Sequence, residues 1–148
     1  MNNAINLIAR NVFKQFVYTS DTFMGRRFGM WRFPRLRNGV YKGDCEDFAL
    51  IVAKHYYGGK IAAFKAFKSG EAKIIRVGID NSTHAMLVIN NRVVVDNNGK
   101  SYTFSIQGNL VLTYRTYRFL RFYSFSEIVL KVARCFVLDV LTLNYWKV

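Results

Sequence analysis

The chain has 148 residues, of which 51% are hydrophobic and 16% aromatic, and this composition excludes a disordered chain. Its length predicts a single domain over residues 1–148 with a sizeable core. The 22 Lys and Arg residues outnumber the 9 Asp and Glu, and the net charge of +13 indicates an anionic partner or surface.

The first segment predicts an amphipathic helix over residues 3–18, because its apolar residues recur at helical spacing. Residues 1–16 mix Asn, Arg and Lys into the apolar positions and contain no small-residue cleavage site, so we predict no signal peptide. With no export signal, we expect a cytoplasmic protein whose two cysteines, Cys45 and Cys135, stay reduced and do not pair.

Residues 20–42 have no sustained period and are interrupted by Gly25, Gly29, Pro34 and Gly39, so they predict an irregular arm anchored by Trp31 and Phe33. The arm is also basic, and such a run contacts phosphate, an acidic protein or a membrane surface, or is simply a solvated face. We weigh the solvated face above a nucleic-acid site, since no base-reading motif accompanies it. Its arginines are Arg26, Arg27, Arg32, Arg35 and Arg37.

A helix is predicted to begin at Asp44, which stands at the N-cap with Asp47 at the capping-box position. Gly58 and Gly59 end it. Residues 60–67 are consistent with a strand or a helix, whereas 72–79, 83–89 and 92–96 predict strands, the last two forming a hairpin around Asn90-Asn91.

Two further strands are expected at 101–106 and 110–119, followed by a helix over about 125–140 with Ser124 and Glu127 as its capping box. Residues 128–143 are the most apolar stretch, but three charged residues interrupt them, so we expect a buried helix and no transmembrane span. Cys135 lies in this helix among apolar residues and is expected to pack in the core.

Cys45 is the candidate nucleophile, because a thiol in the first turn of a helix is exposed to unpaired N–H groups and to the positive end of the helix dipole. Both effects favour the thiolate, and the same N–H groups are able to bind an oxyanion. Of the two histidines, His55 lies ten residues along the same helix and is out of reach. His84 is therefore the candidate base.

Asp96 is the candidate group that orients His84, and the hairpin register decides whether it reaches the imidazole. A two-residue loop at Asn90-Asn91 would pair His84 with Asn97 and turn Asp96 to the other face. A loop with an odd number of residues would place His84 and Asp96 on one face within diagonal reach. Asn97 is the alternative orienting residue.

The segments Gly43-Asp-Cys-Glu-Asp-Phe-Ala-Leu50, Thr83-His-Ala-Met-Leu-Val88 and Val93-Val-Val-Asp-Asn97 resemble, in that order, motifs of bacterial transglutaminase-like cysteine peptidases. The resemblance covers about residues 30–100, with Trp31 and Pro34 as a looser match. It implies an α+β, papain-like fold with a core of about residues 30–124, in which a helix carrying the nucleophile packs on an antiparallel sheet. It makes Cys45 the nucleophile, His84 the base and Asp96 the orienting group.

Calcium is an optional cofactor of some members of this family, bound through acids that flank the nucleophile, here Asp44 and Glu46. Both acids also have a sufficient structural explanation as helix-capping and dipole-complementing residues. The small size and basic charge of this chain fit a compact intracellular or phage-encoded relative. No other cofactor is expected.

The predicted function is a thiol hydrolase that cleaves a peptide or amide bond of a protein substrate through an acyl-enzyme. The same site would also serve acyl transfer to an amine. A different function is a basic protein on this fold that binds nucleic acid or an acidic protein, for instance a phage factor that acts on its host, with a vestigial site. Such binding would depend strongly on salt.

Overall fold

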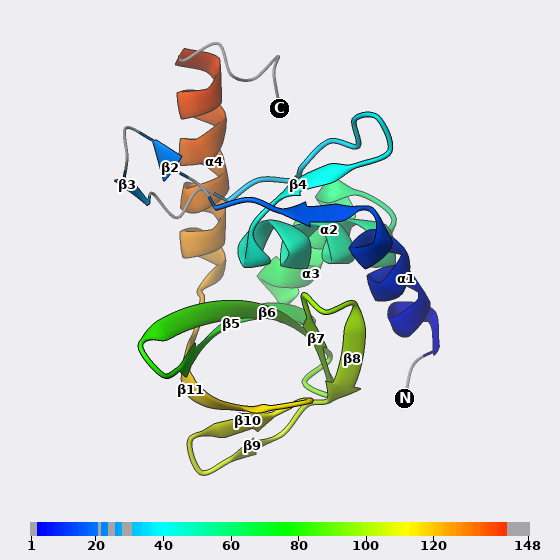
Figure 1. Ribbon diagram of the computed structural model, residues 1–148, viewed down its shortest axis with the longest axis vertical. Coiled ribbons are helices and arrows are strands. Elements are labelled where there is room, and N and C mark those ends of the chain that lie inside the picture. The colour runs from blue at the N-terminus through cyan, green and yellow to red at the C-terminus, as the bar shows by residue number, and fades with distance from the viewer. Residues whose placement is uncertain (1–2, 21, 24–25, 28–30, 142–148) are drawn as a thin grey trace.

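The structure is a computed structural model that describes residues 3–20, 22–23, 26–27 and 31–141, with the backbone alone for 22–23 and 26–27. It is an α+β fold in which helices gather on one side of a curled sheet (Figure 1). The helices within these residues are α1 (Asn3–Lys14), α2 (Cys45–Tyr57), α3 (Lys60–Ser69) and α4 (Phe125–Leu141).

The main sheet has seven strands in the order β8-β7-β6-β5-β11-β10-β9, and all its neighbours pair antiparallel. The sheet curls around an apolar interior (Figure 1). Its strands are β5 (Ala72–Ile79), β6 (Ser82–Ile89), β7 (Val93–Asp96), β8 (Lys100–Thr103), β9 (Ile106–Gln107), β10 (Leu110–Leu112) and β11 (Thr116–Phe122).

The first helix is shorter than predicted, because α1 ends at Lys14 and the chain continues as strand β1 (Phe16–Tyr18). This strand pairs in parallel with β4 (Tyr41–Gly43), which lies some 25 positions later in the chain. Aromatic and β-branched residues favour an extended backbone where a partner strand is present. The distant pairing therefore overrides the helical periodicity of the last residues of the segment.

The arm between β1 and β4 is anchored as predicted, because Trp31 and Phe33 are 1% and 9% exposed. It also contains two short paired strands, β2 (Thr22–Phe23) and β3 (Arg26–Arg27). The predicted breaks at Gly25 and Gly29 lie outside the described residues.

Helix α2 has the predicted boundaries. The Asp44 side chain accepts hydrogen bonds from the backbone N–H of Glu46 and Asp47, and the Asp47 side chain accepts one from the Asp44 N–H. This reciprocal pair is a capping box. At the other end Gly58 has φ +82°, a left-handed conformation that glycine adopts without strain.

The segment at 60–67, which was consistent with a strand or a helix, is the helix α3. The predicted strand at 110–119 was wrong as one piece, because the chain turns at residues 113–115 and forms β10 and β11, which pair with each other. The expected strand at 101–106 is likewise divided into β8 and β9. Short polar turns cannot be located from apolar periodicity alone.

Two hydrophobic cores lie on the two faces of the sheet. One packs α1, α2 and α3 against alternate residues of β6, including Ala85 and Leu87. The other fills the inside of the curl with the remaining apolar residues of β6, including Met86, and with residues of further strands, including Tyr117 of β11. Neighbouring residues of β6 therefore face different cores, which decides where each candidate site residue points.

Helix α4 begins with the predicted capping box, in which Ser124 and Glu127 exchange hydrogen bonds between side chain and backbone. The prediction of a buried helix was wrong for most of its surface. Ile128 and Cys135 are buried, but Leu130 and Leu141 are 69% and 73% exposed, because one face alone packs on the protein. Within the described part of the chain, none of the helices is both long and apolar enough to span a bilayer.

Candidate active site

Cys45 is the first residue of α2, directly after the Asp44 cap, as the sequence predicted. Gly43 precedes the cap, and a Cβ atom at this position would lie 2.5 Å from the Asp47 Oδ2 that accepts the Asp44 N–H. A glycine is therefore required for the capping box to close over the helix start. The Gly-Asp-Cys-Glu-Asp sequence thus has a local structural reason as well as a candidate chemical one.

The thiol of Cys45 is largely buried, and Sγ donates a hydrogen bond to Glu46 Oε2 over 3.0 Å. Burial, followed by the negative charge of Glu46 and of Asp44, raises the pKa of Cys45 far above its ordinary value. The sequence predicted the opposite direction from the helix dipole. The dipole is outweighed because the thiol is desolvated and flanked by two carboxylates.

The N–H groups at the helix start are also used differently from the prediction. Asp44 accepts from the backbone N–H of Glu46 and Asp47, and this cap occupies two of the donors that were expected to bind an oxyanion. The backbone amide of Ala85 faces the sulfur and lowers the pKa of Cys45, opposing the carboxylates. It is the donor group that the structure brings to the thiol from outside α2.

His84 and Asp96 lie together. Their hairpin pairs Ile89 with Val93, so the loop has the three residues 90–92, the odd number that the contact requires. His84 Nε2 lies 2.7 Å from Asp96 Oδ1, with the carboxylate fully buried and the His84 side chain 15% exposed.

Two other donors among the described residues reach the Asp96 carboxylate. The Asn97 backbone N–H donates to Oδ1 over 2.7 Å, and the Tyr117 hydroxyl donates to Oδ2 over 3.4 Å. Asn97 thus contacts the carboxylate through its backbone, and in this geometry the group on the imidazole is Asp96. Buried carboxylates need such donors to remain in place.

Tyr117 is a residue of the site that the sequence did not indicate. Its ring stacks on that of His84, with centroids 5.6 Å apart and an interplanar angle of 27°. Burial raises its pKa, and so does the negative charge of Asp96, so its hydroxyl stays protonated as a donor. Strand β11, which carries Tyr117, is brought to His84 by the pairing of β11 with β5 and of β5 with β6.

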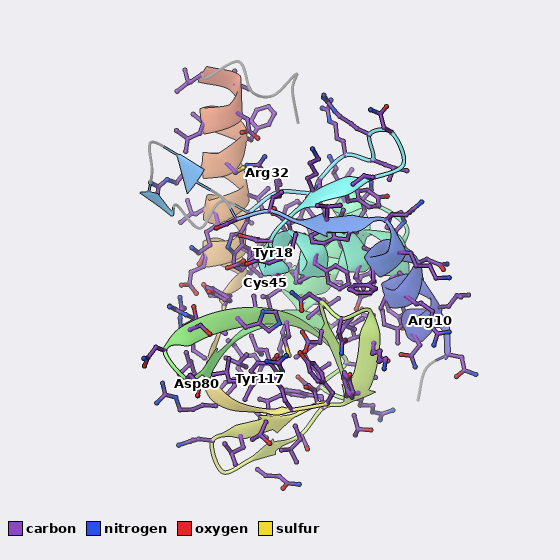
Figure 2. All side chains as sticks on the ribbon, viewed as in Figure 1. Arg10, Tyr18, Arg32, Cys45, Asp80 and Tyr117 are labelled. Carbon is purple, nitrogen blue, oxygen red and sulfur yellow. The ribbon has the colours of Figure 1, made fainter. Side chains whose placement is uncertain are left out.

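The thiol and the tyrosine ring that stacks on the imidazole belong to different cores. Cys45 belongs to the core under the helices, whereas the Tyr117 that stacks on His84 belongs to the interior of the curl. Figure 2 shows Cys45 on the helical side of the sheet and Tyr117 within the curl. Among the interactions of the described residues, none joins Cys45 to His84 directly.

The Cys45 thiol and the His84–Asp96 pair approach each other where the pairing of β6 with β7 ends. Their pairing runs from Ile89↔Val93 to Leu87↔Val95 and extends no further toward His84 within the described ladder. Ala85, whose amide faces the sulfur, is the next residue after His84 on this part of β6, which pairs with β5 but not with β7. The amide that faces the sulfur therefore belongs to the peptide bond between His84 and Ala85.

His55, which was excluded as a base, lies elsewhere. The Tyr41 hydroxyl and His55 Nε2 are 3.0 Å apart. Burial lowers the pKa of His55, and so does the charge of Lys54.

The acids predicted to bind calcium gather around the thiol. One potential ligand atom each of Asp44, Cys45 and Glu46 lies within 4.8 Å of the others. Calcium prefers six to eight oxygen ligands, whereas this set offers one soft thiol and two carboxylates, one of which caps α2. The set does not fit calcium well.

The predicted basic surface is divided. Arg35 and Arg37 are exposed, whereas Arg32 is partly buried and lies 3.9 Å from Asp139 on α4. The side chains of Arg26 and Arg27 lie outside the described part of the structure. Cys135 is buried and, like Cys45, is not in a disulfide.

No family model, no curated protein and no solved structure matches the chain. A function for this site therefore has to be inferred from its own residues.

Proposed function

We propose that the protein is a thiol hydrolase of the transglutaminase-like cysteine peptidase kind, with Cys45 as nucleophile, His84 as base and Asp96 as orienting group. The observation that carries the proposal is the 2.7 Å contact between His84 Nε2 and a fully buried Asp96. His84 directly precedes Ala85, whose backbone amide faces the Cys45 thiol at the start of α2. A cysteine, a base and an orienting group are the three parts that such chemistry needs.

The carboxylate decides which imidazole nitrogen acts. Asp96 accepts from Nε2–H, so the neutral ring carries its proton there and Nδ1 is the basic nitrogen. Nδ1 takes the thiol proton of Cys45, and the sulfur attacks the carbonyl carbon of the substrate. The C–N bond then breaks, and the amine leaves with the proton held on Nδ1.

Water completes the cycle. Nδ1 takes a proton from a water molecule, whose oxygen attacks the thioester carbon, and the carboxylic acid leaves as the sulfur regains a proton. Asp96 stabilises the imidazolium that forms twice. The Ala85 amide is placed to donate to the sulfur or to a substrate oxygen beside it.

Before the reaction, the Cys45 thiol must break its hydrogen bond to Glu46. In the structure it donates to Glu46 Oε2, so rotation of the Cys45 side chain toward His84 precedes proton transfer. The described conformation therefore corresponds to a protonated resting state. Substrate binding that displaces the Glu46 side chain would start the reaction.

A thiol-reactive peptide probe tests the proposal. Cys45 should be labelled faster than Cys135, and His84→Ala should abolish the difference, because Nδ1 is then lost. His55→Ala is the matched control, since His55 contacts Tyr41 and should leave the labelling unchanged. Equal labelling of both cysteines in the unaltered protein would exclude a thiol site at Cys45.

Acyl transfer is the alternative reaction at the same thioester, and the two differ in whether water or an amine attacks it. Supplying a primary amine with a glutamine-containing peptide separates them, because transfer yields an amide product and hydrolysis yields the free acid.

A further inference from the structure

A groove of about 200 Å³ lies between α4 and the arm residues 31–35. Its apolar wall consists of Trp31, Phe33, Phe64, Val132 and Phe136. Such walls are typical of pockets that hold an aromatic or aliphatic group. The volume is that of a single large side chain, so the groove is suited to a small apolar moiety.

A buried donor also lines this groove. The indole of Trp31 is 1% exposed, and its Nε1–H has no hydrogen-bond partner among the described residues. Buried donors are rarely left unsatisfied in native proteins. The Trp31 Nε1–H is closed off by protein atoms, so Trp31 contributes apolar surface to the groove and no hydrogen bond to a bound molecule.

The remaining wall of the groove is positively charged. Three basic residues, Arg32, Arg35 and Lys60, and one acidic residue, Asp139, are among the described residues that line the groove. Asp139 lies 3.9 Å from Arg32, and Lys60 Nζ lies over the Phe33 ring at 5.8 Å from its centroid.

The positive charges are close enough to repel one another. Partial burial lowers the pKa of Lys60, and so do the charges of Lys54 and Arg35. A carboxylate placed beside Lys60 would relieve this repulsion. The position of Lys60 over the Phe33 ring therefore favours an anion beside the apolar wall of the groove.

Two residues that line the groove, Trp31 and Arg32, also contact Tyr123 and the start of α2. Trp31 packs edge-on against Tyr123 with centroids 4.7 Å apart, and the Arg32 backbone N–H donates to Asp47 Oδ1 in the first turn of α2. The Cys45 charge is one of the influences on the pKa of Tyr123. Figure 2 shows Arg32 and Cys45 on the same side of the sheet, beside α4.

We propose that this groove binds an apolar group that bears a carboxylate, with the ring or chain between Trp31 and Phe136 and the anion at Lys60. Its use as a substrate subsite, for an apolar residue flanked by an acidic one, rests on the thiol function proposed above. Binding itself does not rest on that function and is measured separately.

The test uses 3-phenylpropanoate and its neutral amide, 3-phenylpropanamide, with the full chain carrying Trp146→Phe so that Trp31 is the one remaining tryptophan. Titration with the carboxylate should change the Trp31 fluorescence and saturate, with a Kd on the order of a few millimolar for a ligand of this size. The amide should bind at least fivefold more weakly. Equal affinity for the two, or no saturable change, would overturn the proposal.

Two pairs of variants locate the site. Lys60→Met should weaken binding of the carboxylate at least fivefold and leave the amide unchanged, whereas Lys68→Met, on the same helix but away from the groove, should change neither. Phe136→Ala should weaken both ligands, with Leu130→Ala as the control on α4. Phe136 is 54% exposed, so its removal should not prevent folding.

The outcomes separate the groove from the thiol site. If Cys45→Ala still binds 3-phenylpropanoate, and Cys45 of the unaltered protein is not labelled preferentially, the groove is supported and the thiol function is excluded. Normal labelling of Cys45 without binding of 3-phenylpropanoate would exclude the groove and leave the thiol function standing.

Discussion

The contact between Cys45 and Glu46 determines how the candidate nucleophile responds to pH. The pKa of the thiol is raised by burial and then by Glu46 and Asp44, so the thiolate forms only well above the ordinary range of a cysteine. At neutral pH the structure therefore holds Cys45 as a thiol. Any change that removes a neighbouring negative charge should shift its titration downward.

Glu46→Gln is expected to speed alkylation of Cys45 at pH 7, since it removes one of the charges that raise the thiol pKa while burial remains. Each unit by which the pKa falls raises the thiolate fraction about tenfold. The measurement is the rate of iodoacetamide reaction against pH in a Cys135→Ala background, which leaves one thiol. Glu71→Gln, which changes a carboxylate elsewhere on the surface, is the control, and an unshifted profile for Glu46→Gln would contradict the assignment.

Tyr117→Phe removes the hydroxyl that donates to Asp96 Oδ2 and leaves the stacked ring in place. The buried carboxylate then has one donor fewer, and the free energy of unfolding should fall by about 1 kcal/mol. Urea denaturation measures this, with Tyr102→Phe on β8 as the control, because the Tyr102 hydroxyl contacts Asn98 and not Asp96. If Asp96 positions His84 as proposed, labelling of Cys45 should slow as well; unchanged stability would mean that the long hydrogen bond contributes nothing.

The cap of α2 combines two effects that substitution of Asp44 separates. Asp44→Ala removes the cap and a negative charge, so unfolding should require about 1 kcal/mol less and the Cys45 pKa should fall. Asp44→Ser keeps a capping oxygen and removes the charge, so it should lower the pKa with little loss of stability. Thermal unfolding and the alkylation profile are measured on both proteins, and equal destabilisation by the two would show that the charge, not the cap, stabilises the helix.

Elements with local signals were predictable from the sequence. The bounds of α2 and the start of α4 follow from capping residues within four positions of each helix end. The His84–Asp96 contact requires a hairpin loop with an odd number of residues, and the observed register gives a loop of three. These features depend on neighbours in the chain, and such neighbours are visible in a sequence.

The features that could not be predicted depend on contacts between residues distant in the chain. Strand β1 forms because β4 lies beside it, and Tyr117 reaches His84 through two intervening strand pairings. The direction of the Cys45 pKa depends on the orientation of the Glu46 side chain and on burial by the sheet. None of these follows from spacing, which explains why the sequence predicted the contact between His84 and Asp96 but not the direction of the Cys45 pKa shift.

At the scale of the whole molecule, the negative charges are concentrated where the candidate site lies. Four of the nine acids in the chain are Asp44, Glu46, Asp47 and Asp96, while the net charge is +13. Asp44, Asp47 and Asp96 are buried and satisfied by hydrogen bonds, so the exposed surface is more basic than the composition alone suggests. A long-range attraction for anions is therefore expected, whichever reaction the site performs.

This charge gives the alternative function, binding of an anionic partner through the basic surface, a direct test. Binding to a DNA duplex of random sequence should weaken as salt rises, with a slope of log K against log salt of about −0.9 for each phosphate neutralised. Arg37→Gln should reduce the slope by about one such contact, since Arg37 is exposed, and Leu36→Ala next to it should not. Cys45→Ala should bind with the same affinity and salt dependence, because the thiol is buried away from the surface. At about 20 mM salt or below, surface charges are little screened. Absence of binding under these conditions would exclude a dedicated anionic partner of this kind.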